Sequence, residues 1–274
     1  MSRVVVITGA SSGIGLAAAL ALAARGDEVV LLGRHPGRLA AAVAKVREQI
    51  GREPASFRAD FAVLDEVRAV AQRIRSGYER IDVFANNAGG LAGPATVTVD
   101  GHDRAMQVNH LAGFLLAHLL LDRLKAAAPA RLITTASLAE AWGWFDVDRP
   151  MQRTFSRWLA YGASKQANVL FTVEAARRWA SLGVVPTCFF PGLIRSRFAS
   201  TSPSFMLGKL IPVLVGSPRR GADTLVWLAT EADARPGGYY FMRQEFVATP
   251  WATNAGRAER LWRASELAAG LSRN

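Results

Sequence analysis

VVVITGASSGIG, residues 4–15, is the stretch that decides the fold. Its apolar first half indicates a buried strand, and the alanine- and leucine-rich residues that follow up to Arg25 indicate a helix. Glycines at positions 9, 13 and 15 let the backbone approach a ligand closely, and the free N–H groups at the helix start favour a pyrophosphate. The spacing is GxxxGxG rather than the more common GxGxxG. The stretch therefore predicts a strand, a glycine turn and a helix that bind a dinucleotide.

Further apolar runs along the chain extend this unit into a sheet. Strands are expected near residues 3–8, 28–33, 55–58, 81–85, 130–135, 184–190 and 239–242, with helices in the intervals. This alternation predicts an α/β protein with a Rossmann-type, doubly wound parallel sheet and helices on both faces. In such a sheet the ligand lies beyond the carboxyl ends of the strands, at the topological switch point. Residues near those ends, such as Gly9, Asn86, Ser137, Tyr161 and Pro191, are therefore expected to converge on one crevice.

Tyr161 and Lys165 lie four positions apart in Tyr161-Gly162-Ala163-Ser164-Lys165, which places them on one face of a helix. A tyrosine titrates at about pH 10, so it exchanges protons poorly at neutral pH unless a cation stabilises its phenolate. Lys165 is the cation that the spacing offers. A hydrated ion pair stabilises by only about 1 kcal/mol, so a second positive charge and partial desolvation are also needed. A surface tyrosine beside a solvated lysine is the bland alternative.

The end of the second predicted strand indicates which dinucleotide binds. Gly33-Arg34-His35 follows the apolar run, where an NAD site would carry an acid for the ribose 2′-hydroxyl. An arginine at this point instead accommodates a 2′-phosphate, so Arg34 predicts NADP, with NAD the less favoured cofactor. The alternative is a solvated loop arginine. Arg38 could assist Arg34 or lie exposed on its own helix.

These motifs together resemble the classical short-chain dehydrogenases/reductases, over roughly residues 3 to 270. The resemblance rests on the glycine turn, Asp60, Asn86-Asn87-Ala88-Gly89, Asn109, Ser137, Tyr161, Lys165 and Pro191-Gly192, which occur in the family's order. It implies an enzyme that transfers hydride between a nicotinamide cofactor and an alcohol or carbonyl substrate. One departure is Ser12, which stands where the NADP-dependent members carry a second basic residue.

The resemblance also assigns roles to residues. It implies that Tyr161 is the general acid/base, that Ser137 donates a hydrogen bond to the substrate oxygen, and that Lys165 holds the nicotinamide ribose. Asn109 would anchor a water that connects Lys165 to solvent, although it could also be a helix-kinking residue that binds only backbone. The expected cofactor-binding residues are Gly9, Ser11, Ser12, Gly13, Ile14, Gly15, Arg34, Asp60, Phe61, Asn87, Ala88, Gly89, Tyr161, Lys165, Pro191, Gly192 and Ile194.

A narrower likeness concerns the substrate. Residues 108–116, residues 167–172 and Leu261-Trp262 resemble retinol dehydrogenases and the related WW-domain oxidoreductase and protochlorophyllide reductase groups. The resemblance implies a lipophilic alcohol, aldehyde or ketone. Two apolar segments, Trp142 to Phe145 and a lid over about residues 195–218, are expected to shape its pocket. The alternative is that these side chains pack on the core.

Length and composition fit one domain over residues 1–274, with a dinucleotide-binding core at about 3–190 and 239–245. The net charge of +11 comes from basic residues scattered singly, so nucleic acid is not expected as a partner, while a weak association with a membrane surface stays open. Residues 111–121 are too short an apolar run for a membrane span and predict a buried or subunit-interface helix, which leaves a homo-oligomer open. No transmembrane segment is expected.

Cys188 is the only cysteine and falls in an apolar strand, which favours inert core and a cytoplasmic location. The four histidines show no spacing typical of a metal site. A non-catalytic NADP-binding sensor or scaffold is the alternative function. It would need the glycine turn and Arg34 but not the proton-transfer residues, all of which are present here.

Overall fold

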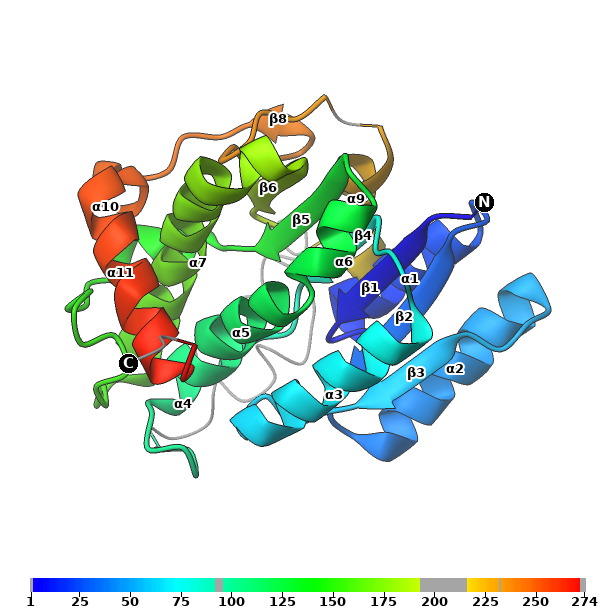
Figure 1. Ribbon diagram of the computed structural model, residues 1–274, viewed down its shortest axis with the longest axis horizontal. Coiled ribbons are helices and arrows are strands. Elements are labelled where there is room, and N and C mark those ends of the chain that lie inside the picture. The colour runs from blue at the N-terminus through cyan, green and yellow to red at the C-terminus, as the bar shows by residue number, and fades with distance from the viewer. Residues whose placement is uncertain (1, 92–95, 193–215, 232, 272–274) are drawn as a thin grey trace.

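The apolar runs of the sequence line up in one eight-stranded sheet in the computed structural model, in the order β3-β2-β1-β4-β5-β6-β7-β8 (Figure 1). The structure describes residues 2–91, 96–192, 216–231 and 233–271. The strands are β1 (Val4–Thr8), β2 (Glu28–Gly33), β3 (Ala55–Arg58), β4 (Val83–Asn86), β5 (Ala130–Thr135), β6 (Val184–Phe189), β7 (Tyr239–Phe241) and β8 (Gln244–Glu245). The pairs from β3 to β7 are parallel, and β8 joins β7 antiparallel.

The helices occupy the intervals between strands, as expected. The α-helices are α1 (Gly13–Ala23), α2 (Pro36–Ile50), α3 (Leu64–Gly77), α4 (Arg104–Met106), α5 (Ala112–Leu119), α6 (Leu121–Ala126), α7 (Arg157–Trp179), α9 (Pro218–Thr230), α10 (Pro250–Thr253) and α11 (Ala255–Ala268). A π-helical turn, η1 (Gln107–Leu111), and two 3₁₀ turns, η2 (Leu138–Trp142) and η3 (Ala180–Leu182), complete the order.

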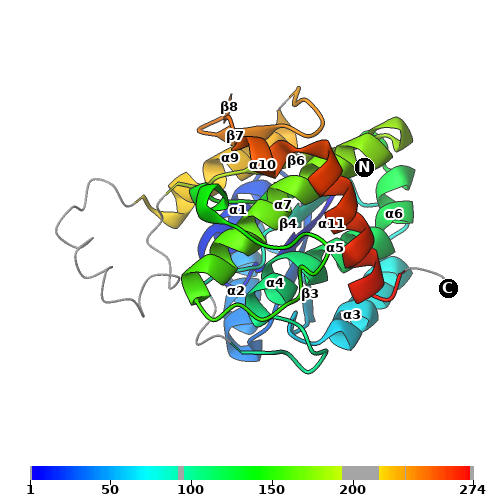
Figure 2. The same cartoon turned by 90° about the vertical axis from the view of Figure 1, so that its left-hand side faces the viewer.

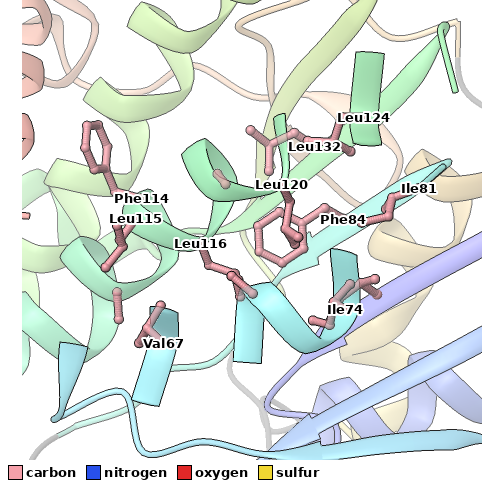
Figure 3. Close-up of a cluster of buried hydrophobic side chains, with 14 of the residues drawn as sticks. Val67, Ile74, Ile81, Phe84, Phe114, Leu115, Leu116, Leu120, Leu124 and Leu132 are labelled. Atoms are coloured by element: carbon pink, nitrogen blue, oxygen red, sulfur yellow. The ribbon is translucent and has the colours of Figure 1, made fainter. Parts of the chain in front are cut away.

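Alternating side chains of β1 supply both layers of the core. Val4 and Val6 face α3, α5, α7 and α11, whereas Val5 and Ile7 face α1, α2 and α9. Both sets are almost fully buried because a parallel sheet is covered on its two faces. Figure 3 shows the first layer, where Phe84 and Leu132 from the sheet meet Leu120 from the end of α5. The predicted doubly wound fold is confirmed.

The sheet reverses its winding between β1 and β4. The chain moves outward from β1 to β2 and β3, and then returns to place β4 on the other side of β1. The carboxyl ends of β1 and β4 therefore border the switch point at which doubly wound sheets bind ligands. Thr8 and Asn86 end these two strands, so the glycine turn and the residues after β4 meet there.

The apolar helix at residues 111–121 is buried by the chain itself. Leu111, Phe114, Leu115 and Leu116 belong to the core layer that includes α3 and Trp262 of α11. Of the two readings that the sequence allowed, a buried helix is the one observed for these side chains. No helix among the described residues is both long enough and apolar enough to span a bilayer.

Candidate active site

The glycine turn leaves the start of α1 open. Gly9 and Gly13 have positive φ angles of 69° and 58°, a conformation that favours glycine. At Gly15 a Cβ atom would lie 2.6 Å from the carbonyl oxygen of Gly9, so only glycine lets the turn close this tightly. Ser12, the N-cap residue, makes no side-chain bond to the first turn of α1. The N–H groups of that turn are therefore suited to an anion, and the turn fits the pyrophosphate of a dinucleotide.

Thr8 fastens the turn to the loop after β4. Its Oγ1 accepts hydrogen bonds from the backbone N–H groups of Asn87, at 2.9 Å, and Ala88, at 2.8 Å. The side-chain amide of Asn87 donates to the backbone oxygen of Thr8 at 2.9 Å. Gly89 follows, and a Cβ there would lie 2.9 Å from Oδ1 of Asn109. The expected cofactor residues Asn87, Ala88 and Gly89 are thus brought beside the glycine turn.

Arg34 and Asp60 meet beyond the carboxyl ends of β2 and β3. Their side chains form an ion pair of 3.9 Å and are 54% and 25% exposed. Asp60 also accepts a bond of 3.0 Å from the backbone N–H of Ala62. Ser11 packs on the strand end, because a Cβ on Gly33 would lie 3.0 Å from the Cβ of Ser11. The two charged side chains therefore remain accessible to a cofactor.

Phe61 supports this end from inside. Its side chain is buried in the core layer with α3, and its backbone oxygen accepts a bond of 3.3 Å from the amide of Gln107. The side chain is therefore turned into the protein.

Ser137 and Tyr161 form the centre of the candidate site. Ser137 caps η2, with its Oγ accepting a bond of 3.2 Å from the N–H of Ala139. Burial raises the pKa of Tyr161 to about 12, and a hydrogen bond with Ser137 opposes this rise. The sequence predicts a lowered tyrosine pKa only when a second positive charge joins Lys165, and in the protein without cofactor the pKa is raised. Removing water from around the phenolate outweighs the hydrogen bond with Ser137.

Lys165 is buried beneath Tyr161 on α7. Its ammonium donates to the backbone oxygen of Thr135 at 2.9 Å and lies 5.7 Å from the centre of the Tyr161 ring. Burial lowers the pKa of Lys165 to about 8. The lysine therefore keeps most of its charge at neutral pH, and the solvated surface pair is not what the structure shows.

Asn109 lies in the π-helical turn η1, which opens the helix towards the loop after β4. Its amide exchanges two hydrogen bonds with the backbone of Gly90, at 2.9 and 3.0 Å. It also donates to Oγ of Ser164 at 2.9 Å. The alternative that Asn109 binds only backbone is therefore wrong, because it joins the β4 loop to α7.

The remaining expected residues lie after β6 and in the segment between Ser137 and Tyr161. Pro191 and Gly192 follow β6 at the same edge of the sheet, whereas Ile194 and most of the expected lid, residues 195–215, lie outside the described residues. Trp142 and Trp144 are 53% and 73% exposed and line a surface groove of about 220 Å³ with Gln166 and Trp251. Core packing is therefore wrong for these two tryptophans.

The groove also differs in direction from the catalytic side chains. Trp142 approaches Gly162, where a Cβ would lie 2.9 Å from its ring. Gly162 follows Tyr161 by one residue and so projects about 100° away from it around α7. Gln166 of α7, and not Tyr161, lines the groove with these tryptophans.

Thr135 is the main residue of the centre that the sequence pattern did not single out. Its backbone oxygen accepts from both Lys165 and, at 3.2 Å, the amide of Asn168. Its hydroxyl donates to Oδ1 of Asn87 at 3.2 Å. The position two residues before Ser137, at the end of β5, was the available signal. Backbone acceptors of this kind have no residue type to reveal them.

Three of the four histidines and the cysteine have structural roles. His110 bonds Ser265 at 3.0 Å, His118 bonds the backbone of Phe114 at 2.9 Å, and His35 caps α2. Cys188 is fully buried, and burial raises its pKa to about 12. Within the part of the chain that the structure describes, no three His, Cys, Asp or Glu side chains gather to hold a metal ion.

Comparison with known proteins identifies the class to which this fold and site belong. A family model described as short chain dehydrogenase matches residues 3–206, and the chain belongs to this family. It is therefore an oxidoreductase that interconverts alcohols and carbonyl compounds. The resemblance found in the sequence is confirmed.

Particular relatives narrow the comparison. The chain is 46% identical over 272 residues to a Streptomyces sp. (strain C5) protein provisionally named daunorubicin C-13 ketoreductase, covering 98% of this chain and 93% of that one. It is 37% identical over 282 residues to human retinol dehydrogenase 13, covering 98% and 85%. The expected likeness to retinol dehydrogenases is confirmed.

Solved structures of other proteins have a similar fold. A Mycobacterium paratuberculosis protein is similar with a TM-score of 0.79 at 31% identity, covering 98% of this chain and 93% of that one. L-sorbose reductase from Gluconobacter frateurii, in complex with NADPH and L-sorbose, is similar with a TM-score of 0.71 at 27% identity, covering 88% and 95%.

Proposed function

We propose that the chain is an NADP(H)-dependent enzyme that interconverts a lipophilic alcohol with its aldehyde or ketone, with Tyr161 as the general acid/base. The carrying observation is that Ser137, Tyr161 and Lys165 meet, and that Lys165 approaches the loop after β4, which packs on the glycine turn. Ser137 hydrogen bonds Tyr161, and the buried ammonium of Lys165 lies behind the phenol ring. A single domain over residues 1–274 and a cytoplasmic location are parts of the same proposal.

Carbonyl reduction follows from the protonation states of these residues. A bound nicotinamide supplies or accepts the hydride. With a pKa of about 12, Tyr161 carries its proton at neutral pH and can give it to the substrate oxygen as negative charge develops there. Ser137 already accepts a bond through Oγ, which leaves its own hydrogen for the same oxygen.

Alcohol oxidation requires a deprotonated Tyr161, so the residue must first lose its proton. Burial opposes the phenolate, and the hydrogen bond from Ser137 offsets only part of this. The Lys165 ammonium favours the phenolate and can also bind the nicotinamide ribose. Positive charge on the oxidised nicotinamide would add to it. Near neutral pH, the site in this form is therefore better suited to reduction.

NADP is proposed as the cofactor because Arg34 extends from the end of β2 with more than half of its side chain exposed. No acid follows β2 to bind a ribose 2′-hydroxyl, and a 2′-phosphate could replace Asp60 as the partner of Arg34. The complex of L-sorbose reductase with NADPH supports this choice.

The lipophilic substrate is supported mainly by the relatives. Retinol, the compound in the name of one of them, is a largely hydrocarbon alcohol, and daunorubicin, in the name of another, joins an aromatic ring system to a polar amino sugar. The L-sorbose reductase, at lower identity, carries a small polar substrate. The exposed tryptophans add little, because Tyr161 does not line their groove.

Cofactor oxidation with a homologous series of aliphatic aldehydes tests the proposal. Each methylene buried in an apolar pocket contributes about 0.8 kcal/mol. Three added carbons should therefore raise kcat/KM by about one to two orders of magnitude. A flat response would remove the lipophilic substrate but leave the reductase. Tight NADPH binding without turnover of any aldehyde, ketone or alcohol would point instead to the sensor.

A further inference from the structure

Glu140 is a buried carboxylate that the catalytic steps above do not use. It lies in η2, three residues after Ser137, and is 3% exposed. Thr249 satisfies both of its oxygens: the backbone N–H donates to Oε1 at 3.1 Å and the hydroxyl donates to Oε2 at 2.6 Å. Charge-assisted hydrogen bonds of this length are among the stronger ones in proteins. Glu140 therefore connects the serine turn firmly to a residue 109 positions away.

Glu174 shows how different this arrangement is. It is also buried on the α7 side of the sheet, but its oxygens form ion pairs with Arg177 and Arg178 on its own helix. Among the residues that the structure describes, no basic side chain forms such a pair with Glu140. Glu174 stabilises one helix locally, whereas Glu140 joins distant segments.

A second contact ties the same C-terminal segment to the site. Gln166, the residue after Lys165, donates to the backbone oxygen of Glu140 at 2.9 Å and accepts from Arg257 at 2.9 Å. We call residues 248–257 the C-terminal strap. Ala248 and Ala252 of the strap are buried against β6 and α7, and Figure 2 shows α10 and α11 lying across α7.

The serine turn depends on such contacts for its position. A 3₁₀ turn has weaker backbone hydrogen bonds than an α-helix and does not hold itself rigidly. The exit from η2 is packed closely on α7, because a Cβ on Gly143 would lie 2.2 Å from the backbone oxygen of Gly162. The carboxylate of Glu140 holds the middle of the turn to Thr249. A displacement of about 1 Å can lower a catalytic rate by about a hundredfold.

We propose that Glu140 is a positioning residue, whose bonds to Thr249 of the C-terminal strap hold Ser137 at hydrogen-bond distance from Tyr161 and the substrate oxygen. The proposal rests on the catalytic role given to Ser137 under the proposed function. It makes the strap, which contains no residue of the catalytic centre, part of what sets the turnover number.

Thr249→Val tests the proposal with a small change. It keeps the shape and the backbone N–H of Thr249, keeps the charge of Glu140 and removes only the hydroxyl bond. Turnover in aldehyde reduction should fall about tenfold, as expected for a lost bond to a charged group. The KM for aldehyde and the Kd for NADPH should stay within about twofold. Thr249→Ser restores the hydroxyl and should keep wild-type turnover.

Two further variants separate positioning from general stability. Glu174→Gln disturbs another buried carboxylate and should lower Tm at least as much as Thr249→Val, with unchanged kcat at a temperature well below both transitions. Adding Thr249→Val to Ser137→Ala should cause no further loss, because the hydroxyl acts through the serine. The turnover of the double variant Glu140→Gln/Thr249→Val should be no lower than that of the slower single variant, because both substitutions weaken the same contact.

The outcomes distinguish the two proposals. Ser137→Ala with wild-type turnover would remove the catalytic role of the serine, and the positioning role with it. A large loss in Ser137→Ala beside wild-type turnover in Thr249→Val would overturn the positioning role alone. Additive losses in the double variant Ser137→Ala/Thr249→Val would overturn it as well, since the threonine would then act by another route.

Discussion

The two ends of the candidate site are built in opposite ways. At the proton-transfer end, Tyr161, Lys165 and Asn109 are 8%, 3% and 2% exposed and are held by hydrogen bonds to backbone and side chains. At the other end, Arg34 and Asp60 form a single ion pair of 3.9 Å, with the arginine more than half exposed. One end is buried and fixed, and the other is exposed and free to exchange partners.

This contrast teaches where large and small effects should appear. In a buried site, removal of water shifts pKa values strongly, as it does for Tyr161 and Lys165. At an exposed site, water and salt screen the charges, so each contact contributes little. Substitutions at the buried end should therefore change rates by orders of magnitude and depend on pH. Substitutions at the exposed end should change cofactor preference modestly and depend on salt.

The largest effect is expected for Tyr161→Phe. Loss of the general acid should lower kcat about a hundredfold or more, while NADPH affinity stays within about twofold. Steady-state kinetics and a fluorescence titration of the cofactor measure the two. Tyr78→Phe is a matched control, because burial also raises the pKa of Tyr78 to about 12 but the residue lies at the end of α3. Near-wild-type turnover in Tyr161→Phe would place the proton donor elsewhere.

A pH-dependent effect is expected at Lys165. In the protein without cofactor its pKa is about 8, so raising the pH above this value removes the charge that attracts the cofactor. The Kd for NADPH should therefore rise by up to about tenfold per pH unit above pH 8, and binding there should take up a proton. Isothermal titration in buffers of different ionisation enthalpy measures both.

Lys165→Met should bind NADPH more weakly and lose this pH dependence, whereas Lys45→Met, at an exposed position on α2, should keep it. An unchanged slope in Lys165→Met would show that another group titrates. The buried end would then lose one of the two residues on which the comparison rests.

A smaller effect is expected from Arg34→Asp. Removing a charged bond to the 2′-phosphate should lower the preference for NADPH over NADH about tenfold or more. The wild-type preference should shrink as salt is added, because Arg34 is exposed. Arg47→Asp, at another exposed ion pair, is the control. Equal affinities of the wild-type protein for NADPH and NADH would remove Arg34 from cofactor selection. A role for Arg38 would require that Arg38→Asp changes these affinities.

The smallest effect is expected from Ser12→Lys. Ser12 is exposed at the start of α1 and its side chain makes no capping bond there, so a lysine fits without displacing a contact. An added surface charge should raise NADPH preference by at most about fivefold. Competition between NADPH and NADH in one assay resolves a change of this size. A larger gain would mean that this end is less hydrated than its exposure indicates.

The sequence predicted most of the sheet because its strands are apolar runs buried on both faces. The first seven strands lie within one or two residues of their expected limits. β8 was not predicted, because it consists of only two residues, Gln244 and Glu245, which are polar and exposed and show no apolar periodicity. The local i, i+4 spacing placed Tyr161 and Lys165 on one face correctly.

Other features of the site depend on information that spacing does not carry. The direction of the Tyr161 pKa is set by burial, and burial is a property of the whole fold. The tryptophans of residues 142–145 were expected over the nicotinamide or in the core. Trp142 and Trp144 reach solvent, so they do not pack in the core, because the path of a 3₁₀ turn depends on its packing. Contacts to backbone oxygens, such as that of Thr135, leave no residue signature at all.

The π-helical turn at Gln107–Leu111 has a consequence for how this chain can change its length. The N–H of Ala112 bonds the oxygen of Gln107, five residues back, so the turn holds one residue more than an α-helix would. Deleting that residue would make the helix regular and leave its two halves on nearly the same faces, because the extra residue is taken up within one wider turn. The change would remove the bulge that sets Asn109 between Gly90 and Ser164. A deletion that relaxes the backbone should therefore keep the core layer from Leu111 onward but lose these contacts of the candidate site.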